Sequence, residues 1–211
     1  MLTMKHTIRV PTVEQCFSIM NEMAMMDHIV AHSCQVCHVA LSIVDLLKAQ
    51  DISLNRDIVC AAALLHDITK TRSLSTGENH ALTGAQLLRE LGYHTVADVV
   101  RQHVRLDSYN TDESPREEEI VNYADKRVLH DEVVTLQQRK TYIIERYGGT
   151  AQRHRYIHEL FENTKKLEEK IFIFLPIPSA KITSHLNLCD VSSDVMTRRN
   201  KHTRHATSNS Q

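Results

Sequence analysis

Apolar side chains recur at three- and four-residue steps through most of the chain, the spacing that places them on one face of a helix. The repeat is longest between Asp27 and Lys48, and a second stretch, Arg56 to Asp67, is apolar on almost every side. A helix that is apolar all round is normally the buried centre of a domain. The pattern therefore predicts an all-α protein with the 56–67 helix at its core.

Residues that start and stop helices divide the chain into eight predicted helices. Thr12 and Asn55 are suited to cap helix starts, Ser114-Pro115 offers a cap followed by a proline at the first helical position, and Gly92 is placed to end a helix. The predicted helices cover about 13–23, 27–48, 56–67, 80–91, 95–103, 115–129, 135–147 and 151–174. No segment alternates with period two for long enough to predict a sheet.

The length of 211 residues favours a single domain. We expect it to span residues 1–175, with its core over 28–147. Pro176 and Pro178 end the regular pattern, and the following residues are rich in Ser, Thr and basic side chains without periodicity. Residues 176–211 are therefore predicted to form a flexible C-terminal tail.

Composition limits the classes of partner. The formal net charge is -1, which gives no electrostatic basis for binding nucleic acid or an anionic membrane. No apolar run approaches the roughly 20 residues that cross a bilayer, and the first ten residues lack the apolar stretch of a signal peptide. Five cysteines, an odd number, are then most simply reduced thiols. These features predict a cytoplasmic protein with no membrane or nucleic-acid partner.

Histidine stands out, at 14 residues, and a few histidines and aspartates fall at the edges of the apolar segments. His66 and Asp67 end the most apolar helix, His32 begins the apolar face of the 27–48 helix, and Asp125 interrupts an apolar helical face. Imidazole and carboxylate together suit divalent ions such as Fe, Mn, Zn or Mg. Any one of them taken alone is more simply a structural residue at the edge of a core.

Three segments that carry these residues resemble one known family. AHSCQVCHVAL contains His32, AALLHDITK contains His66 and Asp67, and VNYADKRV contains Asp125. In residue type, order and helical context they are similar to the HD-domain superfamily of metal-dependent phosphohydrolases, over about residues 28–147. The resemblance implies a compact bundle of about seven to eight helices and one metal ion held by His32, His66, Asp67 and Asp125.

Two further histidines, His80 in NHALTGAQLL and His103 in VVRQHV, lie where two-metal HD enzymes have additional ligands. By this resemblance Asp67 bridges two ions, and His80 and His103 hold the second. The alternative is that both are helix-terminal histidines with local hydrogen bonds.

Several cations near these motifs are candidates for binding substrate phosphate. Lys70 follows the His-Asp pair in HDITK, which resembles the HDIGK text of cyclic dinucleotide phosphodiesterases, and a loop lysine exposed to solvent is the alternative. Arg72 and Arg105 are candidates for the same role. Arg127 is expected to orient Asp125 or to touch substrate, with a salt bridge as the alternative. Asp67 and Lys70 are the predicted catalytic residues.

A competing motif, C-x-x-C-H from Cys34 to His38, is the attachment motif of c-type haem. It lies inside a regular amphipathic helix of a chain without an export signal, so Cys34 and Cys37 are better explained as small buried side chains.

The predicted function is hydrolysis of a nucleotide or related phosphate by metal-activated water, with one or two divalent ions. A monoester, a diester and a phosphoanhydride all remain open. The segment after His103 lacks the Gly-Tyr-Pro of cyclic dinucleotide phosphodiesterases. The two-metal arrangement resembles HD hydrolases that split diadenosine tetraphosphate symmetrically, and this resemblance makes diadenosine tetraphosphate the leading specific substrate, with a simple nucleotidase as the alternative. The alternative is a non-catalytic, metal-containing HD module that binds a nucleotide or a protein partner. The oligomeric state, including a homodimer, stays open.

Overall fold

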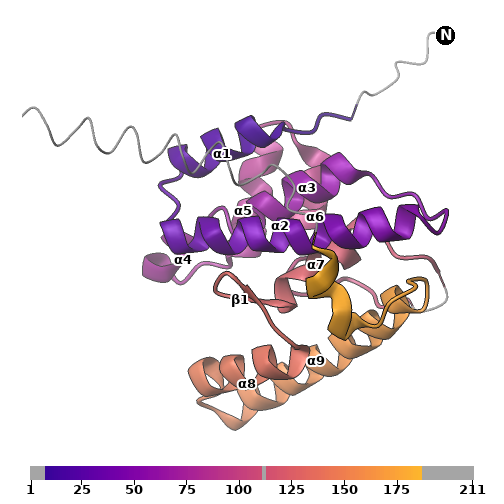
Figure 1. The fold of residues 1–211 in the computed structure, drawn as a ribbon. Helices are drawn as coiled ribbons and strands as arrows, with labels where there is room; N and C mark the ends of the chain where they lie inside the picture. Colours follow the sequence, from indigo (N-terminus) through magenta and orange to yellow (C-terminus); the bar gives the residue numbers. More distant parts are fainter. Residues whose placement is uncertain (1–7, 111–112, 187–211) are drawn as a thin grey trace, which may run out of the picture.

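Helices dominate the computed structural model, which describes residues 8–110 and 113–186 (Figure 1). The all-α prediction is confirmed. In chain order the elements are α1 (Val13–Glu22), α2 (Asp27–Lys48), α3 (Arg56–Leu65), α4 (Lys70–Thr76), α5 (His80–Glu90), α6 (His94–Arg101), α7 (Glu117–Lys126), β1 (Val128–Leu129), β2 (Glu132–Val133), α8 (Leu136–Tyr147), α9 (Ala151–Phe172) and the 3-10 helix η1 (Ser179–His185).

The apolar helix α3 is the centre of the fold, as its sequence predicts. Every residue from Ile58 to Leu65 is buried, and α1, α2, α6 and α7 pack around it. Helix α7 in turn contacts α9, and α8 lies against α9, so these last two helices form a separate layer at the bottom of Figure 1. The core therefore lies between α2, α3, α6 and α7, and any polar group at the rim of α3 is held by rigid neighbours.

Several predicted helix ends are confirmed at the atomic level. The Thr12 hydroxyl accepts a hydrogen bond from Gln15 N, and the Gln15 side chain accepts one from Thr12 N, which completes a capping box. Asn55 accepts from Ile58 N at the start of α3. Gly92, with φ of 83°, follows α5 in the left-handed conformation that glycine adopts without steric cost.

The segment between Asp67 and His80, predicted as a loop, instead contains α4. Its Ser and Thr hydroxyls donate to carbonyls one turn back, as in Ser73 Oγ to Lys70 O, and so do not compete with the helix. Gly77, at φ of 70°, ends the helix and donates from its N–H to Ser73 O. The glycine was the sequence signal for this short helix.

The helix that carries Asp125 is shorter at both ends than predicted. It is capped by Arg116 rather than Ser114, because Glu119 accepts from Arg116 N. It ends at Lys126, and Val128 and Leu129, predicted to be helical, pair with Val133 and Glu132 as the antiparallel strands β1 and β2. β-Branched residues favour this extended conformation. His130 makes the tight turn between the strands with a φ of 57°.

Part of the predicted tail belongs to the folded structure. Helix η1 packs against α2 and buries Ile182 completely. An apolar side chain removed from water in this way contributes about 1.5–3 kcal/mol, which explains why the chain is ordered beyond Pro178. The remainder of the predicted tail, residues 187–211, lies outside the described residues.

Helix α2 is, among the described helices, the one long and apolar enough to cross a bilayer, but 78% of its apolar stretch is buried inside the fold. That burial is typical of a core helix. The C-x-x-C-H motif lies within it: Cys34 is buried, and the thiol of Cys37 is 3.7 Å from that of Cys60 on α3. Cys34 and Cys37 are therefore core residues on the buried side of α2, as expected of small apolar side chains.

Candidate metal centre

The six predicted ligands converge at one end of α3. His32 comes from α2, His80 is the first residue of α5 and Asp125 lies in α7. His66 and Asp67 form the turn after α3, and His103 follows the end of α6. The structure brings two groups of possible ligand atoms within 4.8 Å of one another: His32, His66 and Asp67 in the first, and Asp67, His80 and His103 in the second. Asp67 belongs to both.

Asp125 completes the first group. His32 Nε2 is 3.2 Å from Asp125 Oδ1, and His66 Nε2 is 3.7 Å from the same oxygen. His66 Nε2 is also 3.5 Å from Asp67 Oδ2. The imidazole nitrogens of His32 and His66 thus lie close to carboxylate oxygens of Asp67 and Asp125, a donor set suited to a borderline or hard divalent ion.

The histidines of the second group, His80 and His103, lie close to the other carboxylate oxygen of Asp67, Oδ1. His80 Nε2 is 3.1 Å and His103 Nε2 is 3.6 Å from Asp67 Oδ1, and the two Nε2 atoms are 3.1 Å apart. The carboxylate therefore presents Oδ2 to the first group and Oδ1 to the second. This is the placement that a carboxylate bridging two cations requires.

Backbone carbonyls fix the orientation of three of the imidazoles. The Nδ1 atoms of His32, His66 and His103 lie 2.7, 2.8 and 2.7 Å from the carbonyl oxygens of His130, Ala63 and Val100. A carbonyl only accepts, so each ring carries its proton on Nδ1 and, when neutral, turns the lone pair of Nε2 toward the carboxylates. Metal-binding histidines are held in this way.

The fit of a metal to this centre rests on His66 Nε2. This buried nitrogen has no hydrogen bond to any of the residues that the structure describes. A lone pair buried without a partner is costly, and a cation between His66, Asp67 and Asp125 would satisfy it.

Two further side chains of α7, Lys126 and Asn122, fix the positions of the ligand residues Asp125 and His103. Lys126 Nζ lies 3.2 Å from Asp125 Oδ2 and also donates to the carbonyl oxygen of His103. Asn122 Nδ2 donates to the same carbonyl at 3.0 Å and to Gln102 O at 2.9 Å. Helix α7 therefore supplies one ligand, Asp125, and fixes the backbone of another, His103.

The charges of the centre match what a cation requires. Burial alone would raise the pKa of Asp67 and Asp125, but His66 beside Asp67 and Lys126 beside Asp125 outweigh it and hold both pKa values well below the ordinary range. Burial lowers the pKa of His66 to about 4, against the opposing pull of Asp67. Two ionised carboxylates and a neutral His66 are therefore present near neutral pH.

His32 makes metal binding pH-dependent. Burial lowers its pKa, but the hydrogen bond to Asp125 and the charge of Asp125 outweigh burial, so the pKa of His32 is raised above 6.5. This ring must lose its Nε2 proton before it binds a cation. We expect metal affinity to weaken as the pH falls through this raised pKa, by about tenfold per pH unit for one displaced proton.

Calorimetric titration of the full chain with Mn²⁺, in buffers of different ionisation enthalpy, measures the number of protons released. Release of one proton near neutral pH is the expected result. Affinity that does not change between about pH 8 and about pH 6 would contradict the assignment of His32 as a ligand.

The three cations Lys70, Arg72 and Arg105, which were predicted to bind phosphate, differ in how close they lie to the metal centre. Lys70, at the start of α4, puts Nζ 3.9 Å from Asp67 Oδ1 and 3.4 Å from His80 Nε2, and its side chain is one-third exposed. Arg72 is turned away from the centre and pairs with Glu78 at 2.7 Å. Arg105 is exposed. Of these three, Lys70 reaches the metal centre.

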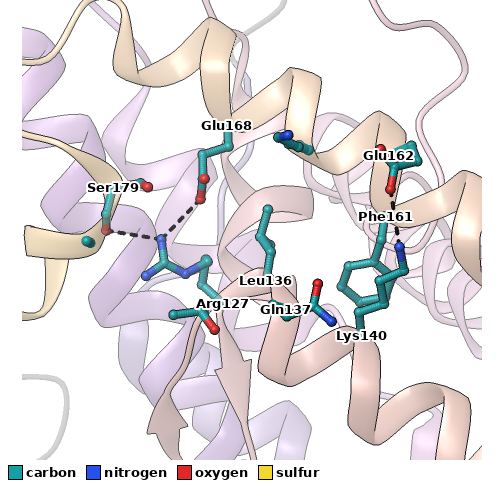
Figure 2. Close-up of a pocket in the computed structure, with 11 residues that line it drawn as sticks. Arg127, Leu136, Gln137, Lys140, Phe161, Glu162, Glu168 and Ser179 are labelled. Carbon is teal, nitrogen blue, oxygen red and sulfur yellow. Dashed lines mark hydrogen bonds and ion pairs between the residues drawn. The ribbon is translucent and has the colours of Figure 1, made fainter.

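Arg127 is buried on the far side of α7 from Asp125. Its guanidinium donates to Val134 O, to the Tyr123 hydroxyl and to Ser179 O, and it pairs with Glu168 at 3.4 Å. The structure thus shows the salt bridge that was the alternative for this residue. Figure 2 shows Arg127 at the wall of a cavity of about 370 Å³ between α8, α9 and η1, where its neighbours Lys140 and Glu162 also pair with each other.

Three groups near the ligands were not foreseen. Lys126 follows Asp125 directly, and its place beside a ligand was the available signal. His130 contributes a backbone carbonyl, which no side-chain pattern reveals. Arg139, on α8, lies 3.9 Å from Asp125 Oδ1, and its position in a polar stretch of sequence gave no signal.

Comparison with known proteins adds the following. The family model described as HD domain matches residues 29–128. A tRNA (cytidine(56)-2'-O)-methyltransferase of Picrophilus torridus is 28% identical over 175 residues, which cover 77% of this chain and 47% of that protein. The chain thus spans about half the length of this curated relative. The crystal structure of a predicted HD superfamily hydrolase from an uncultured Thermotogales bacterium shares 19% identity with a TM-score of 0.42, over 82% of this chain and 98% of that one.

Proposed function

Because residues 29–128 of this chain form an HD domain, we propose that the protein is a metal-dependent phosphohydrolase acting on a nucleotide or related small-molecule phosphate. The observation that carries this proposal is the position of Asp67, whose two oxygens face two separate sets of imidazoles. Such a carboxylate between two donor sets suits a pair of divalent cations such as Fe, Mn, Mg or Zn.

Divalent cations held here would supply Lewis-acid chemistry, activating water and neutralising charge on the phosphoryl oxygens. The residues of the chain position them. His32, His66 and Asp125 would hold one cation, His80 and His103 would hold the other, and Asp67 would contribute to both sets. Lys70 brings a flexible ammonium beside Asp67 and His80, where it is able to follow the charge of a phosphate.

The substrate follows less directly from the site. A phosphomonoester, a phosphodiester and a phosphoanhydride are all compatible with this donor set. Diadenosine tetraphosphate is the specific substrate that we propose to test first. The methyl transfer in the name of the Picrophilus torridus relative belongs to a protein about twice as long, and imidazoles with carboxylates are donors for a metal rather than a site for a methyl donor. The cytoplasmic location and the lack of a nucleic-acid or membrane partner stay predictions, and the oligomeric state stays open.

The proposal is tested by loading the purified full chain with Mn²⁺, Fe²⁺ or Zn²⁺ and measuring phosphate release. The panel comprises diadenosine tetraphosphate, cyclic dinucleotides and mononucleotides, with a tRNA added because of the relative's name. Turnover of at least one small phosphate is the expected result. Metal binding without turnover of any of them would support the non-catalytic binding module instead, and lack of metal binding would contradict the metal centre itself.

The number of metals is tested by His103→Ala. We expect the metal content, measured by elemental analysis, to fall from about two to about one per chain, because this ring serves the second group alone. His94→Ala is a matched control, since His94 is exposed at the start of the same α6. An unchanged metal content in His103→Ala would mean that His103 has a structural role.

A further inference from the structure

Arg139 reaches the metal centre from a helix that supplies no ligand. It lies in the first turn of α8, in the α8–α9 layer at the bottom of Figure 1. Its neighbours Gln137 and Gln138 are exposed, whereas the Arg139 side chain is only 15% exposed. The side chain of Arg139 therefore points inward from α8, toward the carboxylate of Asp125.

The guanidinium of Arg139 has hydrogen-bond donors to spare. Its Nη2 is 3.9 Å from Asp125 Oδ1, too far for a hydrogen bond, and within residues 8–110 and 113–186 its side chain makes none. The neighbouring cations differ: Lys126 is bonded to Asp125 and to His103 O, and Arg127 is bonded on the far side of α7. The Arg139 nitrogens are not among the fully buried polar atoms that lack a partner, so these N–H groups are open to solvent and available to an anion.

A chain of close contacts through the candidate metal ligands links Arg139 to Lys70. From Arg139 the contacts pass through Asp125, His66 and Asp67 to His80 and then Lys70, with neighbouring polar atoms 3.1 to 3.9 Å apart. The candidate metal ligands thus lie between two cations. A ligand that spanned these contacts would meet a positive charge beside Asp125 and another beside Asp67.

The two cations differ in what they recognise. A guanidinium presents a planar fork of N–H groups that matches two oxygens of one phosphate, whereas an ammonium acts as a point charge. Two separate cations suit an anion with more than one phosphate. Two linked phosphates carry negative charge on each phosphate and so offer a partner to both cations, one beside Asp125 and one beside Asp67.

We propose that Arg139 binds a substrate phosphate at the Asp125 end of the centre and, with Lys70 at the other end, selects phosphoanhydrides over phosphomonoesters. This inference rests on the proposed function, which it deepens by naming the class of substrate. It also gives α8 a role, because Arg139 is the side chain by which this helix reaches the centre.

The test uses inorganic pyrophosphate and orthophosphate as probes on the Mn²⁺-loaded full chain, with binding measured by calorimetry. Arg139→Gln is expected to weaken pyrophosphate binding by about 10- to 100-fold, the loss expected for hydrogen bonds to a charged group. Orthophosphate binding should weaken less. Arg139→Lys, which keeps the charge without the fork, should fall between. Metal content and the circular dichroism spectrum should stay unchanged in both variants.

Arg146→Gln is the matched control, because Arg146 is exposed in the last turn of the same helix. It should bind both probes as the wild-type chain does. If Arg139→Gln does not fold, Arg139→Lys decides: weaker pyrophosphate binding supports the proposal, and unchanged binding overturns it. Wild-type affinity in folded Arg139→Gln also overturns it, as does loss of metal, which would make Arg139 a positioning residue for Asp125.

The outcomes separate this inference from the proposed function. A chain that hydrolyses the phosphate panel but shows no effect of Arg139→Gln keeps its function and loses this inference. A chain that binds pyrophosphate through Arg139 but hydrolyses no phosphate keeps this inference and is a binding module.

Discussion

Replacing Asp67 by alanine is expected to remove the bound metal and to reduce phosphate hydrolysis by more than about 100-fold. Residues that merely orient metal ligands already contribute 10–100-fold to affinity or activity, and Asp67 is the one residue that both ligand groups share. Its loss leaves His66 and Asp125 on one side and His80 and His103 on the other without the carboxylate between them. Elemental analysis and phosphate release from the best substrate of the panel measure the two effects.

The control for this substitution is Asp57→Ala. Asp57 is an exposed aspartate in the first turn of α3, the helix that Asp67 follows. It should keep its metal and its turnover. A folded Asp67→Ala protein that retained both would show that the reaction takes place elsewhere in the molecule.

The largest loss of stability is expected for Lys170→Ala. Lys170 on α9 and Glu119 on α7 form an ion pair, with Nζ 2.8 Å from both carboxylate oxygens and both side chains at most 2% exposed. Removing one partner of a buried pair costs about 3–5 kcal/mol, because the other stays buried without compensation. Glu119 would keep its hydrogen bond from Arg116 N, so we expect a value near the lower end. Urea denaturation measures the free energy of unfolding.

Two further variants make this prediction specific. Lys166→Ala removes an exposed lysine one turn earlier on α9 and should change the stability by less than about 0.5 kcal/mol. The double variant Glu119→Gln with Lys170→Met removes both charges together and should be much closer to wild type than Lys170→Ala. Equal losses in the Lys166 and Lys170 variants would mean that the pair adds nothing to the packing of α9 on α7.

Four of the candidate ligands stand out in the sequence because they lie at the edges of apolar helical segments, whereas His80 and His103, and the metal-binding role of all six, came from the family resemblance. His66 and Asp67 end a helix that is apolar on all sides, and Asp125 breaks one apolar face. Local periodicity identifies such positions without knowledge of the tertiary fold. It does not show how they meet, and the division of Asp67 between two ligand groups follows from the packing of α3, α5 and α6.

The partners of the charged residues could not be predicted in this way. Arg127 is two residues after Asp125, and residues two apart on a helix do not face the same side, so its side chain points away from Asp125 and meets Glu168, 41 residues away. In sequence, Lys170 cannot be distinguished from the exposed lysines of the polar helix α9. Only the packing of α9 on α7 buries it. Both pairings depend on contacts distant in sequence, as does the approach of Arg139 to the ligands.

The short strands were missed for a different reason. A two-residue strand has too few positions for alternation to appear, and Val128 and Leu129 continue the helical spacing of the residues before them. What ends the helix is the pairing with Glu132 and Val133.

The turn between these strands determines which residues position 130 can accept. His130 serves His32 through its carbonyl oxygen, and its φ of 57° is a conformation that glycine and asparagine adopt more readily than histidine. Its side chain is therefore dispensable to the metal centre, while the shape of its backbone is not. Glycine or asparagine at position 130 would therefore preserve the carbonyl that orients His32, whereas a β-branched residue, which does not tolerate this backbone conformation, would displace it.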